Sequence, residues 1–119
     1  MAKILIVDDA KFMRVTLSKV LKKGNHVIVG EAENGKQAIS LYKQLQPELV
    51  TMDITMPEMN GIEALKEIMK INSKAKVIMC SAMGQQRLVV EAIEMGAKDF
   101  LVKPFDENQV IDAINRVLE

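Results

Sequence analysis

Three carboxylates follow short apolar stretches of the chain, at positions where a buried strand would end. Asp8 and Asp9 come directly after the stretch ILIV, and Asp53 comes directly after LVTM. A carboxylate at the end of a buried strand is costly to bury unless a cation or hydrogen-bond donors pair with it. The sequence should therefore supply a positive partner for these acids.

Two more polar side chains stand at the ends of apolar stretches. Ser81 ends VIMCS, and Lys103 follows DFLV. In an open parallel sheet the carboxyl ends of the strands lie along one edge, and ligands bind there. We therefore expect Asp8, Asp9, Asp53, Ser81 and Lys103 to converge, whereas Glu31, at the end of another apolar stretch, has no obvious partner.

The convergence of these groups predicts a particular chemistry. Carboxylates that lie within a few ångströms repel one another unless cations lie among them. Lys103 supplies one positive charge, and a set of oxygen donors without histidine or thiolate favours Mg²⁺ over Zn²⁺ as the second cation. A carboxylate beside Mg²⁺ and a lysine can attack phosphorus to form an aspartyl phosphate, and Ser81 can hydrogen-bond a phosphoryl oxygen.

Each of these residues also has an ordinary structural explanation. Asp8 and Asp9 fit a turn that caps a helix, and Asp53 fits an acid in a loop. Ser81 fits a turn, and Lys103 fits a solvated lysine. The prediction of a site therefore depends on all of them occurring together at the ends of four strands.

The elements that must position these residues alternate along the chain. Amphipathic spacing typical of helices occurs between the apolar stretches, and it continues after the last one. This alternation predicts an α/β fold with a parallel sheet that helices cover on both faces. The expected strands are 3–8, 26–31, 48–53, 76–81 and 98–102. The apolar positions of the expected helices are Met13, Leu17, Val20 and Leu21; Ala38, Leu41, Tyr42 and Leu45; Leu65, Ile68 and Met69; the segment 85–95; and Val110, Ala113, Ile114 and Val117.

Glycines mark the expected ends of the helices. Gly24 and Gly96 fit the C-terminal cap position, and the pairs Asn34–Gly35 and Asn60–Gly61 fit turns that lead into a helix.

The overall composition limits the classes of function. The 119 residues suffice for one domain, which we expect to span residues 1–119, and 16 basic residues balance 16 acidic ones. This balance argues against nucleic acid or an anionic membrane as the main partner. The N-terminus lacks the long apolar core of a signal peptide, no apolar run approaches the ~20 residues of a membrane span, and we expect a soluble cytoplasmic protein. Cys80 is expected in the core and His26 at an edge or surface.

Four stretches together resemble the receiver domain of two-component response regulators, and most closely its single-domain chemotaxis members. They occur in the order and at the spacing typical of the family, across essentially the whole chain. The resemblance implies a doubly wound, flavodoxin-like fold with strand order 2-1-3-4-5. The stretches are ILIVDDAKFMR, LVTMDITMPEMNG, VIMCSAMGQQ and GAKDFLVKPF.

The resemblance also implies a role for each acid. Asp53 would be the residue that accepts the phosphoryl group. Asp9 would bind Mg²⁺ directly, Asp8 would bind it through water, and Thr55 would contribute its backbone carbonyl.

By the same resemblance, Ser81 and Lys103 would contact the phosphoryl group, and Lys103–Pro104 would be a cis peptide, a geometry plausible only before proline. Phe100 lies at the aromatic switch position. Many chemotaxis members carry tyrosine there, so any hydrogen bond from that hydroxyl to a partner is absent in this chain.

The function implied is signalling rather than enzyme catalysis. A histidine kinase would donate the phosphoryl group, and the protein would then bind a target, the flagellar motor switch in a chemotaxis member, and lose the group only slowly. The fourth helix, fifth strand and fifth helix would form the target surface. The resemblance also allows a phosphatase partner. It implies a monomer that can dimerise when it is phosphorylated.

Three other functions are weighed against this one. The chain fits a receiver outside chemotaxis, or the receiver of a larger regulator such as a transcriptional one. A phosphohydrolase that uses an aspartyl phosphate needs a second acid two residues after the nucleophile, where this chain has Thr55. A flavin-binding module is disfavoured because the chain has three phenylalanines, one tyrosine and no tryptophan to sandwich a ring.

Overall fold

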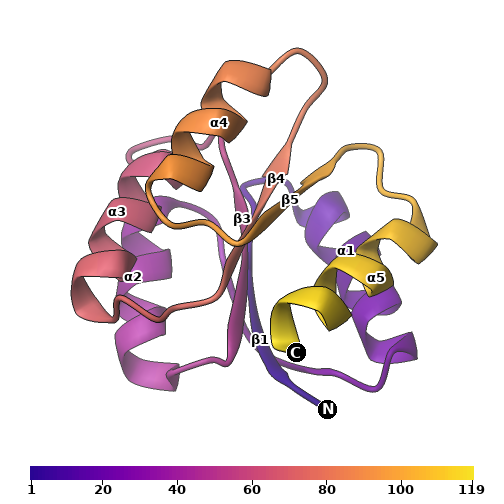
Figure 1. Ribbon diagram of the computed structural model, residues 1–119. Helices are drawn as coiled ribbons and strands as arrows, with labels where there is room; N and C mark the ends of the chain where they lie inside the picture. Colours follow the sequence, from indigo (N-terminus) through magenta and orange to yellow (C-terminus); the bar gives the residue numbers. More distant parts are fainter.

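Strands and helices alternate throughout the computed structural model, which describes residues 1–119 (Figure 1). The strands and helices predicted from the sequence are confirmed, with ends that differ by a residue or two. The strands are β1 (Lys3–Val7), β2 (Val27–Ala32), β3 (Leu49–Asp53), β4 (Val77–Ser81) and β5 (Asp99–Val102). The helices are α1 (Lys11–Lys23), α2 (Gly35–Leu45), α3 (Gly61–Ile71), α4 (Gln86–Glu94) and α5 (Glu107–Leu118).

The five strands form one parallel sheet in the order β2-β1-β3-β4-β5, which confirms the predicted α/β fold. All residues of β3 and β4 are buried, as expected for strands covered on both faces. The strand order reverses direction between β1 and β3. Their carboxyl ends are therefore the place where an open α/β sheet binds ligands.

Helices cover the sheet in two layers (Figure 1). One apolar cluster joins alternate strand residues, such as Val50 and Met52, to α2, α3 and α4. A second cluster joins the residues of the opposite face, such as Leu49 and Ile78, to α1 and α5. Because both faces of the central strands β3 and β4 are buried, a ligand can reach this part of the sheet only at the ends of the strands.

Asparagine caps start the two helices that follow Asn–Gly pairs. Asn34 accepts a hydrogen bond from the N–H of Gln37, and Asn60 forms a reciprocal capping box with Glu63. At the other helix ends, Gly96 has a positive φ of 117°, whereas Asn25 rather than Gly24 adopts the left-handed conformation after α1. The cap prediction for Gly24 therefore holds for its position but not for its backbone conformation.

The prediction for His26 holds for its place beside β2, an edge strand of the sheet, but not for a position at the surface. Its side chain is buried, and its Nδ1 accepts a hydrogen bond from the N–H of Ala2 at 3.1 Å. Burial and the nearby N-terminal charge lower the pKa of His26, against the opposing effect of Glu48. The imidazole is therefore a neutral acceptor that holds the start of β1 next to β2.

Candidate functional site

Strand register brings two of the predicted acids together. Val7 pairs with Met52 across the β1–β3 ladder, so that the next residues, Asp8 and Asp53, leave the sheet side by side. Both side chains are buried, whereas Asp9 is exposed. Oxygen atoms of these three carboxylates lie within 4.8 Å of one another.

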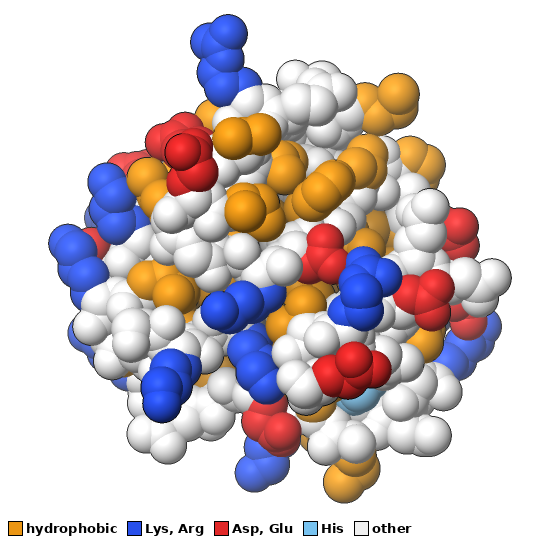
Figure 2. Space-filling model, viewed as in Figure 1, with side chains coloured by type: hydrophobic (Ala, Val, Ile, Leu, Met, Phe, Trp, Pro, Cys, Tyr) orange, Lys and Arg blue, Asp and Glu red, His pale blue; other side chains and the backbone are white.

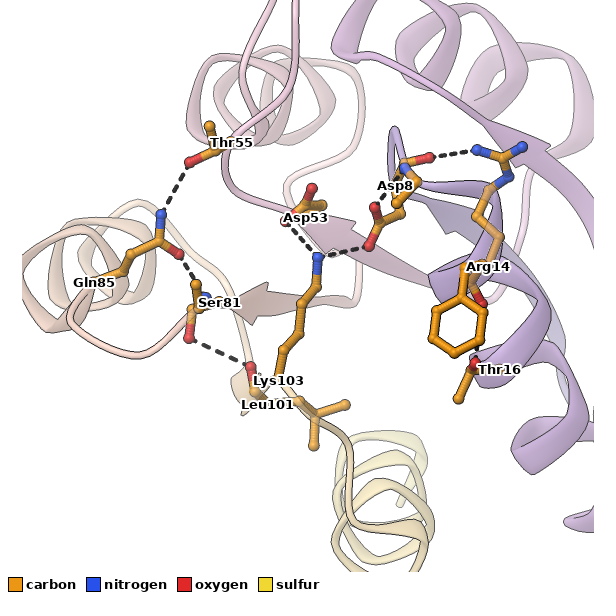
Figure 3. Close-up of polar contacts among 12 residues, drawn as sticks. Asp8, Arg14, Thr16, Asp53, Thr55, Ser81, Gln85, Leu101 and Lys103 are labelled. Carbon is orange, nitrogen blue, oxygen red and sulfur yellow. Dashed lines mark hydrogen bonds and ion pairs between the residues drawn. The ribbon is translucent and has the colours of Figure 1, made fainter.

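Lys103 reaches these acids from the end of β5 (Figure 3). Ser81 pairs with Val102, and the N–H of Lys103 donates to the carbonyl of Ser81 at 2.8 Å, which fixes where the lysine leaves the strand. Its Nζ lies 2.8 Å from Oδ2 of Asp8 and 3.1 Å from Oδ1 of Asp53. The Lys103–Pro104 peptide bond is cis.

The charges of these groups perturb one another. Burial and the charge of Asp8 raise the pKa of Asp53 to about 6, even though the Lys103 ammonium opposes both effects. Burial disfavours the charge of Lys103, but its hydrogen bond to Asp8 and the charge of Asp53 outweigh that effect and raise the pKa of the lysine. A further cation would therefore be stabilised among these carboxylates.

The donor atoms of the site fit Mg²⁺. Carboxylates of Asp8, Asp9 and Asp53 come close enough together to bind one ion, and no histidine or thiolate lies among them. Mg²⁺ prefers such oxygen donors and usually binds through one or two carboxylates plus water. The sulfur of Cys80 is not available, because this side chain is buried in the core, as predicted, and burial raises the pKa of its thiol to about 12.

Of the two predicted switch residues, Ser81 lies next to the acids, because it follows Cys80, the partner of Asp53 in the sheet. Ser81 is buried, and its hydroxyl donates a long hydrogen bond of 3.4 Å to the carbonyl of Leu101. The Phe100 side chain is 44% exposed. The two residues come from neighbouring strands, β4 and β5.

Comparison with known proteins gives the family of this chain. The response regulator receiver domain matches residues 4–115. The chain belongs to the response regulator receiver family. Protein CcdB of Bacillus subtilis is 60% identical over 118 residues, which cover 99% of this chain and 98% of that protein. Chemotaxis protein CheY of Thermotoga maritima is 59% identical over 115 residues, which cover 97% and 96%.

Solved structures agree with this assignment. The receiver resembles CheY in the crystal structure of the CheX–CheY–BeF3–Mg²⁺ complex from Borrelia burgdorferi, with a TM-score of 0.94 and 38% sequence identity. The alignment covers 98% of this chain and 89% of that one.

Arg14 is a residue of the receiver site that the sequence analysis missed. Its guanidinium is buried; Nη1 donates to the carbonyl of Asp8 at 2.7 Å, and Nε donates to Glu31 at 2.9 Å. Glu31 therefore has a partner after all. The signal was the spacing of Arg14, Leu17 and Leu21, which places the arginine on the buried face of α1.

Gln85 is a second residue that was missed. Its Oε1 accepts from the N–H of Ala82 at 2.7 Å, and its Nε2 donates to the hydroxyl of Thr55 at 2.9 Å (Figure 3). The side chain of Thr55 therefore helps to join two loops of the site. The sequence analysis had assigned a role only to its backbone carbonyl.

Gly61 allows the backbone to close up behind Asp53. Its N–H donates to the carbonyl of Ile54 at 2.7 Å, and a Cβ added to Gly61 would lie 2.0 Å from the carbonyl oxygen of Asp53. Only glycine fits here, so this residue sets the path of the chain after β3.

None of the helices of the receiver is both long and apolar enough to cross a bilayer.

Proposed function

We propose that this receiver accepts a phosphoryl group on Asp53 from the phosphohistidine of a histidine kinase, and that the change of charge alters its affinity for a target protein. The observation that carries this proposal is the position of Asp53, which is buried and shares the ammonium of Lys103 with Asp8. A structural ion pair would need one carboxylate, whereas here the lysine contacts two, and Asp9 adds a third carboxylate within 4.8 Å of them.

The carboxylate of Asp53 is the nucleophile. One of its oxygens forms a bond to phosphorus while the bond between phosphorus and the imidazole nitrogen of the kinase breaks, and the electron pair of that bond stays on the nitrogen. Lys103 contacts Asp53 and lies where it can offset negative charge on the transferring group. The hydroxyl of Ser81 has only one long hydrogen bond to give up before it turns toward a phosphoryl oxygen.

We propose that Asp9, Asp53 and the backbone carbonyl of Thr55 hold Mg²⁺ directly and that Asp8 holds it through water. The bound cation supplies positive charge that offsets the charge of the phosphoryl group. The CheY of Borrelia burgdorferi, in its complex with BeF3 and Mg²⁺, supports this assignment by similarity. Asp9→Ala is then expected to abolish Mg²⁺-dependent phosphorylation, and phosphorylation that persists would contradict the metal site.

The target surface is proposed on α4, β5 and α5. Apolar side chains gather over α4 and β5 on the face shown in Figure 2, and those exposed there are Val90 (58%), Ile93 (42%), Phe100 (44%) and Val102 (40%). The hydroxyl of Ser81 would turn toward the phosphoryl group to hydrogen-bond it, and the ring of Phe100 would then move from an exposed to a buried position. Phosphorylation thereby selects one of two states.

The relatives named CheY support chemotaxis as the process and the flagellar motor switch as the target, with cytoplasmic action. CheX in the Borrelia complex supports a partner protein for this chain also, and we propose that such a partner is a phosphatase. We propose no enzyme turnover beyond slow loss of the phosphoryl group. Two further points stay predictions: that residues 1–119 act as a single receiver domain, and that the protein can dimerise once it is phosphorylated.

The decisive experiment is intact-mass spectrometry after incubation with acetyl phosphate, with and without Mg²⁺. We expect one added phosphoryl group, which requires both Mg²⁺ and Asp53. Asp53→Asn should prevent the addition, whereas Asp112→Asn, which alters an exposed acid of α5, should not. If a cognate kinase also fails to add the group to the folded wild-type protein, the proposal is wrong.

A further inference from the structure

The amide of Gln85 joins the two loops that flank Asp53. It accepts from Ala82, which directly follows β4, and donates to Thr55, which follows β3 and lies 30 positions away in the sequence. Figure 3 shows this bridge beside Asp53 and Lys103. One side chain therefore ties together the ends of the two central strands.

The N–H of Ala82, which donates to Gln85, is the first donor beyond the β3–β4 ladder. The last rung runs from the N–H of Ile54 to the carbonyl of Cys80, at 3.2 Å. In a parallel ladder the next rung would join the N–H of Ala82 to the carbonyl of Ile54. That carbonyl accepts from Gly61 instead, at 2.7 Å, so the N–H of Ala82 has no strand partner.

This freed N–H lies where an anion on Asp53 would need a donor. Asp53 pairs with Cys80 in the sheet, and Ala82 is only two residues further along β4. Backbone N–H groups are good donors to phosphate oxygens, and a charged acceptor makes a stronger bond than a neutral amide does. In the unmodified protein, however, the carbonyl of Gln85 takes this hydrogen bond.

We propose that Gln85 is a positioning residue that holds both loops in the unphosphorylated arrangement and must release the N–H of Ala82 when Asp53 carries a phosphoryl group. This inference rests on the proposed function. Release also frees the loop that contains Met83, which lines a cavity of about 430 Å³ together with Ser81 and Phe100. Gln85 therefore opposes phosphorylation and links it to movement beside Phe100.

The bridge is tested first in the metal-free, unphosphorylated protein. Hydrogen exchange of the Ala82 amide, followed by NMR, is expected to be roughly threefold to tenfold faster in Gln85→Ala, as for the loss of one net hydrogen bond. Gln86→Ala is the matched control, because this neighbouring glutamine is exposed and has no part in the bridge. It should exchange as the wild type does.

The competition is tested with beryllofluoride as a mimic of the phosphoryl group, in the presence of Mg²⁺. The concentration of beryllofluoride that half-saturates the protein should fall roughly threefold to tenfold in Gln85→Ala. Gln85→Glu keeps an acceptor for Ala82, now a charged one, and should raise that concentration. Opposite effects of these two substitutions are not expected from a side chain that merely packs.

Two results separate the failure of this inference from the failure of the proposed function. If wild-type protein binds beryllofluoride and Gln85→Ala binds it equally well, with equal thermal stability and equal exchange at Ala82, the role of Gln85 is overturned. If folded wild-type protein binds no beryllofluoride at any Mg²⁺ concentration, the phospho-acceptor site itself is overturned, and this role with it.

Discussion

The ammonium nitrogen of Lys103 lies 3.1 Å from Oδ1 of Asp53, although 50 positions separate the two residues in the sequence. The lysine extends from β5 across the end of β4 to an acid on β3. It supplies the positive partner that a buried carboxylate requires. The lysine compensates only part of the cost of burying this charge, because burial and the charge of Asp8 still raise the pKa of Asp53 to about 6.

Removal of the lysine should raise the pKa of Asp53 above 6 in metal-free protein. In Lys103→Met the burial and the charge of Asp8 persist, while the one positive charge that opposes them is lost. Titration of the Asp53 carboxyl carbon by NMR measures the change. Lys98→Met, which removes an exposed lysine just before β5, should leave the titration as it is in the wild type. An unchanged midpoint in Lys103→Met would show that the ion pair contributes nothing.

The stability of the metal-free protein should depend on pH through Asp53. Its pKa is raised from 3.8 to about 6 on folding, so the protonated form favours the folded state. That contribution is fully present below the unfolded pKa and is lost as the pH rises through about 6. Asp53→Asn lacks this loss, and it should be more stable than the wild type by on the order of 1 kcal/mol near neutral pH, with allowance for solvent screening.

Urea unfolding in the presence of a chelator measures this difference. The advantage of Asp53→Asn should shrink at about pH 4, and added Mg²⁺ should reduce it at neutral pH, because the cation stabilises the ionised wild-type site. Asp112→Asn serves as the control for an exposed acid. An advantage of Asp53→Asn that is independent of pH would rule out the titration of Asp53 as its cause.

The meeting of Asp8, Asp53 and Lys103 could be predicted from the sequence for a simple reason. Each residue directly follows or ends an apolar strand, and parallel strands bring their carboxyl ends to one edge regardless of the details of the loops. The predicted α/β fold follows from the same alternation. The strand order came only from the family resemblance, since the spacing of apolar residues does not say which strands are neighbours.

The residues that were missed or misplaced depend on side-chain geometry. His26 directly precedes β2, where a polar residue is usually exposed, and only the three-dimensional contact with Ala2 makes it a buried acceptor. Arg14 was missed because the apolar positions of α1 were taken to include Met13, one residue earlier, so a charge on the buried face was not considered. Gln85 depends on the conformation of two loops, for which the spacing of residues gives no rule.

Gly61→Ala should disrupt the site through the backbone of Asp53. The added Cβ would meet the carbonyl oxygen of Asp53, which is part of the backbone and cannot move as a flexible side chain would. We expect a loss of stability on the order of 3 kcal/mol and slower phosphorylation by acetyl phosphate. Thermal unfolding and intact-mass spectrometry measure the two effects.

Gly84→Ala is the informative comparison for this substitution. Gly84 has open space around it but a positive φ of 89°, so alanine there meets backbone strain without a clash. Its cost should be about 1 kcal/mol. Equal costs at the two glycines would argue against close packing behind Asp53.

Thr51→Val should stabilise the protein. The Thr51 hydroxyl is fully buried in β3 and has no hydrogen-bond partner, so its loss of contact with water is not compensated. Valine has nearly the same shape and no polar atom, and we expect a gain of about 1 kcal/mol in the free energy of unfolding, measured with urea. Thr16→Val is the control, because the Thr16 hydroxyl donates to the carbonyl of Phe12. A loss of stability in Thr51→Val would indicate an unseen partner for the hydroxyl, such as a buried water.

Replacement of Arg14 should weaken Mg²⁺ binding even though Arg14 is not a ligand. Its guanidinium fixes the carbonyl of Asp8 and reaches Glu31 on β2, so it sets the path of the backbone that carries Asp8 and Asp9. Loss of a residue that orients metal ligands typically lowers affinity about tenfold or more, and we expect such a loss in Arg14→Met by calorimetric titration of Mg²⁺. Arg14→Lys should recover part of the affinity, since an ammonium can replace one of the two donors but not both.

Arg116→Met separates this positioning effect from a general loss of positive charge. Arg116 also forms an ion pair, with Asp99 at 2.7 Å, but it lies on the exposed side of α5, away from the three acids. Its replacement removes the same charge and should leave Mg²⁺ affinity within about twofold of the wild type, as for a surface ion pair. If Arg14→Met and Arg116→Met reduce Mg²⁺ affinity equally, the contact between Arg14 and the Asp8 carbonyl does not position the metal ligands, and the buried arginine serves only the stability of the fold.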